Sequence, residues 1–371
     1  MQPYGDYPDL RGVRRILVVK LRHLGDVLLS SALITNIKKA VPDARVDLLI
    51  YQEGKEILEG HPAINEFLYI DRGWKKLSLF QRLKNEFKLL LQIRKNSYDL
   101  VINLTEGDRG AVIALISSAS IRVGLDPGKS GFLGKKKIYT HLVKKCKTPR
   151  HQVEKDLDAL RRIGIFPTLE ERVLHFAIPK PALDKMASYR GAIVIHAVSR
   201  WRFKCLPLES IRLLIEELLD LGEKVILTSG NDPVEVALLE TLPCSYNLAG
   251  GLTLKELGAL ILVAKALITV DSLPLHMASA LKTPVVALFG PSSELNWGPW
   301  MHKQSRVVVQ NYSCRPCHLD GCGGSKVSDC LVTLPVKRIL GSLEELLGGV
   351  VPQAGFCRHP LALLQEPLSK L

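Results

Sequence analysis

Short apolar blocks alternate along the chain with segments in which apolar residues recur at helical spacing. In the first half the blocks are "RRILVVKL", "RVDLLIY", "YDLVINL" and "IRVGL", and in the second half they are "AIVIHA", "EKVILTS", "ALITVD" and "PVVALFG". Their Val, Ile and Leu content is nearly continuous, which is typical of parallel strands covered on both faces. The alternation predicts an α/β protein with two doubly wound, Rossmann-like domains.

Proline and glycine mark the ends of the predicted helices. "LGDVLLSSALITNIKKAVPDA" predicts a helix that ends at Pro42, and "LPLESIRLLIEELLDLG" predicts one with Pro207 near its start and Gly222 just past its end. The proline-marked region 167–181 is the expected link between the halves. We therefore expect an N-terminal domain over residues 1–170, a C-terminal domain over 185–348 and a loosely packed tail over 349–371.

Bulk composition narrows the classes of partner. The chain has 371 residues, a formal net charge of +13 and 47% hydrophobic residues, which fits a large globular core and an anionic partner. Nucleic acid is the weakest candidate, because aromatic residues make up only 6% and are not interleaved with basic runs. A phosphorylated substrate or an anionic membrane surface remains. The start of the chain shows no signal-peptide pattern and charges interrupt each longer apolar run, so we expect a cytosolic protein without a transmembrane span.

The first candidate site is "KLRHLGDVLL", which follows the first apolar block. In doubly wound sheets, ligands bind beyond the carboxyl ends of the strands. Gly25 allows a tight turn there, and Asp26 stands at the start of the next helix. Asp26 either complements the helix dipole or acts as a general base facing a cleft. The neighbouring basic residues could bind phosphate on an acceptor: Lys20, Arg22 and His23.

Two stretches of the second half have the chemistry of an anion site. In "HAVSRWRFKCLP", hydroxyl and cationic groups lie between a strand and a helix, which suits a diphosphate, although a solvated basic loop is the alternative. In "LITVDSLPLHMASALKTPVVALFGPSS", Asp271 and Ser272 close a strand and His276 lies in the first turn of the following helix. Taken singly, Ser272 could be an N-cap and His276 a packed histidine.

Together these three stretches resemble the ADP-heptose–lipopolysaccharide heptosyltransferases, family nine of the glycosyltransferases. The resemblance runs in order over about residues 14–345, and its most specific parts are "LRHLGDVLLSSALITNIKKAVPDARVDLL", "VDSLPLHMASALKTPVVALFGPSS" and "SRWRFK". The form "VDSLPLHMA", with "SRWRFKC" before it, is most similar to the subgroup that adds the third inner-core heptose. The chain has Leu273 where family members usually have Gly.

The resemblance implies a GT-B architecture, with two Rossmann-like domains facing a cleft. The N-terminal domain would bind the acceptor and the C-terminal domain the ADP-sugar. The implied reaction is an inverting transfer of heptose from ADP-L-glycero-D-manno-heptose to the lipopolysaccharide core, onto its second heptose, with no metal or other cofactor. The resemblance makes Asp26 the catalytic base and Lys204 the group that stabilises the departing ADP. The implied donor-binding residues are Ser199, Lys204, Asp232, Asp271, Ser272 and His276.

Other functions stay open at this point. The same fold and donor would serve another inner-core step, that of heptosyltransferase I or II. A non-catalytic nucleotide-sugar-binding protein is a second alternative, which the combination of Asp26, Lys204 and His276 disfavours. A dinucleotide-dependent oxidoreductase is disfavoured because no Gly-x-Gly-x-x-Gly follows the first strand of either half.

Two further stretches have competing interpretations. Cys314, Cys317, Cys322 and Cys330 in "CRPCHLDGCGGSKVSDC" could hold a structural zinc ion, but packed, reduced cysteines are favoured. "WKKLSLFQRLKNEFKLLLQIRKN" predicts an amphipathic basic helix; packing of its apolar face on the core is the commoner arrangement, and contact with an anionic membrane the alternative. We expect this segment and the second basic run, "KKKIYTHLVKKCKTPR", to contact phosphates of the lipopolysaccharide core or the cytoplasmic face of the inner membrane.

Overall fold

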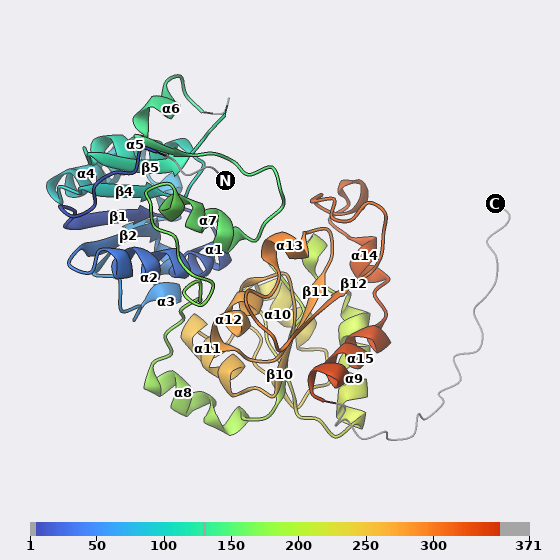
Figure 1. Cartoon of the computed structure of the whole chain (residues 1–371). Coiled ribbons are helices and arrows are strands. Elements are labelled where there is room, and N and C mark those ends of the chain that lie inside the picture. Colours follow the sequence, from blue (N-terminus) through green and yellow to red (C-terminus); the bar gives the residue numbers. More distant parts are fainter. Residues whose placement is uncertain (1–4, 129–130, 349–371) are drawn as a thin grey trace.

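Two parallel six-stranded sheets form the frame of the molecule (Figure 1). The structure is a computed structural model, and it describes residues 5–128 and 131–348. The strand order is β3-β2-β1-β4-β5-β6 in the first sheet and β12-β11-β10-β7-β8-β9 in the second. The predicted α/β fold with two doubly wound halves is confirmed. The predicted tail over 349–371 lies outside the described residues.

The first half contains the strands β1 (Arg15–Val19), β2 (Arg45–Tyr51), β3 (Glu66–Ile70), β4 (Leu100–Asn103), β5 (Ile121–Leu125) and β6 (His141–Val143). Its α-helices are α1 (Leu24–Leu29), α2 (Ser31–Ala40), α3 (Lys55–Leu58), α4 (Leu79–Lys95), α5 (Asp108–Ile116), α6 (Lys135–Ile138) and α7 (Gln152–Arg161). The segment 162–179 then connects α7 to α8 without regular structure.

The second half contains the strands β7 (Ile193–His196), β8 (Val225–Leu227), β9 (Tyr246–Asn247), β10 (Ala266–Val270), β11 (Val285–Phe289) and β12 (Ser305–Val309). Its α-helices are α8 (Lys180–Met186), α9 (Leu208–Asp220), α10 (Pro233–Leu239), α11 (Leu254–Val263), α12 (Leu273–Leu281), α13 (Glu294–Trp297), α14 (Asp329–Val332) and α15 (Val336–Leu346). Short 3₁₀ turns, such as the one at Arg202–Lys204, complete the loops.

The helices of the first half bury both faces of its sheet. Leu17 and Val19 of β1 share an apolar cluster with Leu89 and Ile93 of α4 and with residues of α5. The alternate residues of β1, Ile16 and Val18, belong to a cluster on the other face with α1, α2, α3 and α7. Burial from both sides explains why this central strand is apolar at each of its last four positions.

Two details differ from the predicted helices. The segment predicted as one helix up to Pro42 consists of α1 and α2, which are separated at Ser30, where the Ser30 hydroxyl donates to the carbonyl of Val27 (2.7 Å). The predicted packing of the apolar face of α4 on the core is wrong. Phe80 and Phe87 are 78% and 63% exposed, and α4 is anchored to the sheet by Leu89 and Ile93 instead.

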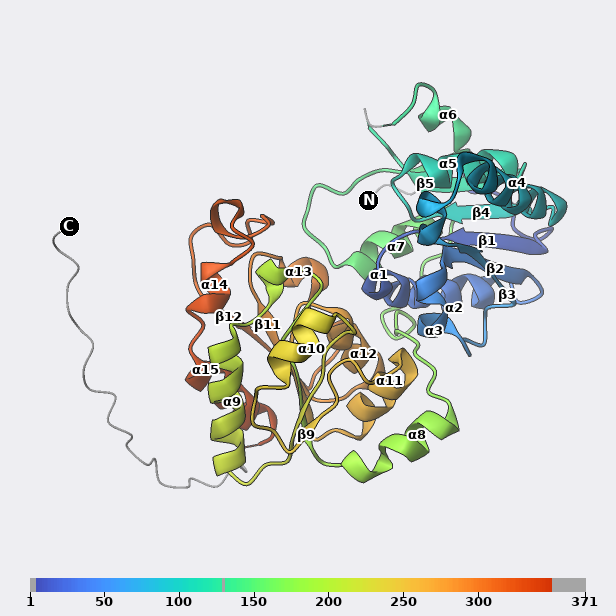
Figure 2. The ribbon, with the colours of Figure 1, turned by 180° about the vertical axis from the view of Figure 1, so that it is seen from behind.

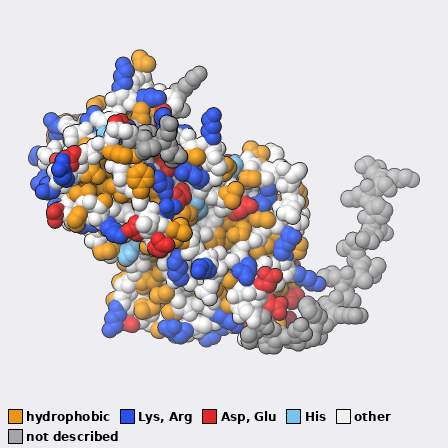
Figure 3. All heavy atoms as spheres, viewed as in Figure 1, with side chains coloured by type: hydrophobic (Ala, Val, Ile, Leu, Met, Phe, Trp, Pro, Cys, Tyr) orange, Lys and Arg blue, Asp and Glu red, His pale blue; other side chains and the backbone are white. Residues whose placement is uncertain are grey.

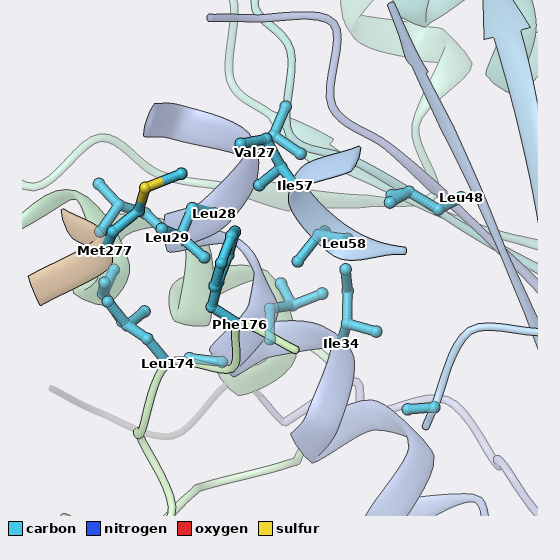
Figure 4. Packing of buried hydrophobic residues seen from close by; sticks show 14 of the residues in the cluster. Val27, Leu28, Leu29, Ile34, Leu48, Ile57, Leu58, Leu174, Phe176 and Met277 are labelled. Atoms are coloured by element: carbon cyan, nitrogen blue, oxygen red, sulfur yellow. The ribbon is translucent and has the colours of Figure 1, made fainter. Parts of the chain in front are cut away.

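The two halves pack against each other through α1 and α12, which lie side by side (Figures 1 and 2). Figure 4 shows Leu28 and Leu29 of α1 beside Met277 of α12 and Phe176 of the connecting segment, all buried in one apolar cluster. Because α1 follows β1 and α12 follows β10, the carboxyl edges of the two sheets meet at this contact. Within the described ranges, no helix is long and apolar enough to span a membrane.

Candidate active site

Asp26 lies half-buried in the first turn of α1, at the carboxyl edge of the first sheet. His23, three residues before Asp26, is the N-cap of α1 and has an extended backbone. A carboxylate at this position complements the dipole of the helix. Arg22 and His23 are exposed beside it, as a role in contacting an anionic acceptor requires.

Lys20 lies in the interior, unlike Arg22 and His23. Its side chain is only 1% exposed, and its Nζ donates to Oδ1 (2.9 Å) and Oδ2 (2.7 Å) of Asp156 in α7. Burial raises the pKa of Asp156, and the Lys20 charge acts in the opposite direction. The direct acceptor contact expected of Lys20 does not fit this position. Lys20 instead fixes the start of the Asp26 turn to α7, since two buried opposite charges hold each other in place.

The basic loop of the second half is folded around Ser199. The Ser199 hydroxyl accepts a hydrogen bond from the backbone N–H of Trp201 (3.2 Å), and its own N–H donates to the Cys205 sulfur (3.1 Å). Lys204 ends the short 3₁₀ turn in the loop, and its Nζ donates to Oδ2 of Asp271 at the end of β10 (2.6 Å). The structure thus brings Lys204 and Asp271 together, 67 residues apart in the chain.

His276 lies at the centre of the site, 4% exposed in the first turn and a half of α12. Burial lowers the pKa of its imidazole, while the carboxylates of Asp271 and Asp26 oppose that shift. The ring is therefore neutral at pH 7. Its Nδ1 is buried and has no hydrogen-bond partner in the described part of the chain. Ser272, the N-cap residue of α12, donates its hydroxyl to the carbonyl of Val270 (3.3 Å), which leaves the backbone N–H groups at the start of α12 uncapped by that side chain.

Close contacts join the Asp26 turn to the second half. A Cβ atom added to Gly25 would lie 2.9 Å from Cδ2 of His276. His23 lies edge-to-face with Trp201, with ring centroids 6.1 Å apart, and its Nδ1 is 3.4 Å from a guanidinium nitrogen of Arg200. The glycine thus permits the approach that places Asp26 within electrostatic reach of His276.

Asp232 has a structural task in this conformation. It is the N-cap of α10, and its Oδ1 accepts hydrogen bonds from the N–H groups of Val234 (2.9 Å) and Glu235 (3.2 Å). Glu235 is half-buried; burial and Asp232 raise the pKa of its carboxyl group, and Arg202 acts against them. Glu235 is thus the less exposed of the two carboxylates, and Arg202 of the basic loop acts on it.

Sequence reasoning missed two residues that support the site. Asp156 holds Lys20, and a signal was present, since Asp156 falls on the apolar face of α7 beside Val153 and Leu157. His151 caps α7, and its ring stacks on Trp300 of the second half (centroids 4.5 Å apart). Burial lowers the pKa of His151 to about 4. Spacing in the sequence gives no sign of this contact, because the two residues are far apart in the chain.

The cysteine-rich loop contacts the site through Ser328, whose hydroxyl donates to the carbonyl of Phe203 in the basic loop (2.7 Å). Cys314 and Cys322 are exposed, Cys317 is half-buried and Cys330 is buried. Burial raises the pKa of the Cys330 thiol, Cys322 and Cys317 raise it further, and Arg315 acts against them. Over residues 5–128 and 131–348, no three His, Cys, Asp or Glu side chains are grouped so that they could hold a metal ion.

Fold and site together define a class of protein. Two Rossmann-like halves meet at their carboxyl edges, with a carboxylate on one side and a lysine, a neutral histidine and a helix N-terminus on the other. This is the layout of a GT-B-type glycosyltransferase. The model of the glycosyltransferase family 9 (heptosyltransferase) matches residues 86–327, and the chain belongs to this family.

Relatives and solved structures agree with that assignment. Lipopolysaccharide heptosyltransferase 3 of Escherichia coli K12 is 32% identical over 346 residues, which cover 90% of this chain and 98% of that protein. Lipopolysaccharide heptosyltransferase 2 of the same strain is 23% identical, with the same coverage of both chains. The structure of the E. coli ADP-heptose lps heptosyltransferase II superposes with a TM-score of 0.72 at 22% identity and covers 90% of this chain and 98% of that one.

Proposed function

We propose that the protein transfers heptose from ADP-L-glycero-D-manno-heptose to the lipopolysaccharide inner core, adding the third heptose to the second. Family membership and the greater identity to heptosyltransferase 3 than to heptosyltransferase 2 support this step. The observation that carries the mechanism is the position of the Asp26 turn across the contact between the halves. A Cβ added to Gly25, next to Asp26, would lie 2.9 Å from Cδ2 of His276, and the charges of Asp26, Asp271 and Lys204 all act on that imidazole.

Asp26 acts as the general base in this reaction. Its carboxylate takes the proton of the acceptor hydroxyl as that oxygen attacks the anomeric carbon of the donor. The bond between this carbon and the diphosphate oxygen breaks as the new glycosidic bond forms. The electron pair leaves with ADP, and attack from the opposite face inverts the anomeric centre.

The second half stabilises the charge that develops on the leaving diphosphate. Lys204 supplies a positive charge, and the N–H groups at the start of α12, a nine-residue helix, face the same region. Ser199 and Ser272 add hydroxyl groups, and neutral His276 is available to hydrogen-bond the sugar or a phosphate oxygen. These groups do what a divalent cation does in other sugar transferases, so we propose a reaction that needs no metal. Asp232 or Glu235 would contact the ribose.

The first half binds the acceptor in this proposal. Arg22 and His23 are exposed next to Asp26 and would contact phosphates on the core oligosaccharide. Lys20 fixes the turn that carries them through its buried ion pair with Asp156. The acceptor is part of a lipid-anchored molecule, so the enzyme would work at the cytoplasmic face of the inner membrane. Its positive net charge of +13 suits both partners.

Replacement of Asp26 by Asn tests the assignment of the base. The change keeps the size of the side chain and removes its basicity, so we expect kcat to fall by roughly a hundredfold or more with little change in the affinity for ADP. Asp329→Asn, an exposed position in the first turn of α14, is the matched control and should keep normal turnover. Near-normal turnover of Asp26→Asn would remove Asp26 from the role.

The acceptor step and the metal requirement need a separate assay. The enzyme is incubated with ADP-heptose and soluble core acceptors that carry one or two heptoses, with and without EDTA. Sugar addition to the two-heptose acceptor alone, unaffected by EDTA, is the expected result. Addition to an acceptor with fewer heptoses would reassign the step, and loss of activity in EDTA that added metal restores would refute the metal-free mechanism.

A further inference from the structure

An exposed apolar stripe runs along the outer side of α4. Leu79, Phe80, Leu83, Phe87 and Leu91 are 71%, 78%, 58%, 63% and 42% exposed. Leu79 and Phe80 are adjacent and the others follow at intervals of three or four residues, which puts all five on one side of the helix. Val112 and Leu115 of the neighbouring helix α5 are also exposed. Single exposed apolar residues are normal, but a contiguous patch with two phenylalanines indicates a binding surface.

Basic residues frame this stripe. Residues 75–95 contain seven Lys and Arg but a single acidic residue, Glu86, which is paired with Arg109 of α5. The seven basic residues are all exposed: Lys75, Lys76, Arg82, Lys84, Lys88, Arg94 and Lys95. Figure 3 shows Lys and Arg side chains crowded at the edge of the molecule over α4. An apolar stripe within a basic rim is the pattern of helices that lie on anionic membranes.

A groove of about 390 Å³ opens between α4 and α5. Its apolar lining includes Leu79, Leu83, Leu90, Val112 and Ile113. The groove adds concave apolar surface to the stripe on α4. Exposed apolar surface of this kind is what enters the boundary between headgroups and acyl chains.

We propose that this surface, the outer sides of α4 and α5, docks the protein on an anionic phospholipid bilayer. The inference rests on the proposed function in one respect, because only a lipid-anchored acceptor gives the docking a purpose. The geometry agrees with that purpose. Helices α4 and α5 follow the parallel strands β3 and β4, so both begin at the same carboxyl edge of the sheet as the Asp26 turn. A docked enzyme would hold Asp26 near the membrane surface.

A second copy of the chain is the main alternative occupant of the surface. A two-fold dimer would place the same patch against itself and would bring the two basic rims together. Seven positive charges on each side then repel each other with little acidic compensation, whereas an anionic bilayer neutralises them. The charge pattern therefore favours the membrane.

Binding to lipid vesicles tests the proposal with the full-length protein. We expect binding to vesicles of phosphatidylglycerol and phosphatidylcholine, weaker binding to phosphatidylcholine alone, and a decline as salt is raised. Phe80→Ser with Phe87→Ser should weaken binding at least tenfold, because two exposed aromatic side chains no longer enter the bilayer. Lys84→Gln with Lys88→Gln should weaken it roughly twenty-five-fold on anionic vesicles, at about fivefold per charge.

The matched control is Leu213→Ser with Leu262→Ser, which removes two exposed leucines (44% and 41%) from α9 and α11 of the other half. This variant should bind vesicles within about twofold of the wild type. If both apolar variants lose binding equally, or if the wild type binds anionic and neutral vesicles alike, the proposed surface is wrong. A concentration-dependent dimer that the phenylalanine variant dissociates, without vesicle binding by the wild type, would assign the surface to a second copy.

A soluble, lipid-free acceptor separates this inference from the proposed function. The phenylalanine variant should transfer heptose to that acceptor at the wild-type rate and lose activity only on acceptor embedded in vesicles. Vesicle binding without any heptose transfer would refute the proposed function and leave the docking surface intact. Heptose transfer to soluble acceptor without vesicle binding would refute the docking surface and leave the proposed function intact.

Discussion

The buried ion pair between Lys20 and Asp156 makes a sharp prediction about stability. The two side chains are 1% and 3% exposed. Among the side chains of the described residues, only Gln152 also donates to the Asp156 carboxylate, through its side-chain N–H (2.9 Å). Lys20→Met keeps the apolar stem and removes the charge. A buried carboxylate without its partner costs about 3–5 kcal/mol. We expect the free energy of unfolding at pH 8 to fall by that amount.

The loss should depend on pH, with a definite sign. Burial already raises the pKa of Asp156, and Lys20 opposes this shift. Without Lys20 the pKa in the folded state rises further above its unfolded value, so folding takes up a proton. The contribution of Asp156 to the stability of the variant is then greatest at low pH and is lost as pH rises through the folded pKa. The difference from the wild type should be smaller at pH 5 than at pH 8.

Urea unfolding at both pH values measures the effect. Lys145→Met is the control, because Lys145 pairs with Glu106 on the surface (62% and 52% exposed) and its removal should cost less than about 1 kcal/mol. Lys20→Met combined with Asp156→Leu should recover most of the loss, since no charge is then buried. A single variant within about 1 kcal/mol of the wild type, or a loss that is the same at both pH values, would refute the reasoning.

Two further predictions concern the contact between the halves and the core histidines. Gly25→Ala puts a Cβ 2.9 Å from the buried His276 ring, so the free energy of unfolding should fall by about 1–3 kcal/mol and turnover at least tenfold. The control is Gly341→Ala, in a helix with open space around the glycine, which should not destabilise the protein. Equal stability and turnover of the two variants would contradict the close approach of Gly25 to His276. His196 is buried with a pKa lowered to about 4, so it contributes stability above pH 6.5 that is lost as pH falls toward 4. In urea unfolding, the free energy of unfolding of His196→Gln should fall less between pH 7 and pH 5 than that of the wild type. An unchanged pH dependence would contradict this role of His196.

The strands that the apolar pattern predicts are the central ones. The four that it leaves out, β3, β6, β9 and β12, are the edges of the two sheets. An edge strand is covered less completely, so its residues need not be continuously apolar; β9, for example, consists of two exposed residues, whereas all five residues of β10 are buried. The fold class was therefore predictable, while the full width of each sheet was not.

The candidate site was predictable in its parts but not in its assembly. Gly25, Asp26, Ser199, Lys204 and the start of α12 all stand at strand-to-helix turns, where topology predicts ligands. The approach of Gly25 to His276 and the burial of Lys20 depend on how the halves pack. No local pattern encodes that packing. The exposure of Phe80 and Phe87 was missed for a similar reason, because an amphipathic pattern does not say whether its apolar side meets a sheet or something outside the chain.

The apolar contact between α1 and α12 links the position of Asp26, the proposed base, to the packing of the two halves. Val27, Leu28 and Leu29 directly follow Asp26 and are buried in the same cluster as Met277. If the halves moved apart, water would reach the hydrocarbon surface on both helices, and the same movement would take the proposed base away from the proposed donor. In the proposed mechanism, packing of the two halves would therefore both position the base and exclude water from beside it, which would protect the activated donor from hydrolysis between turnovers.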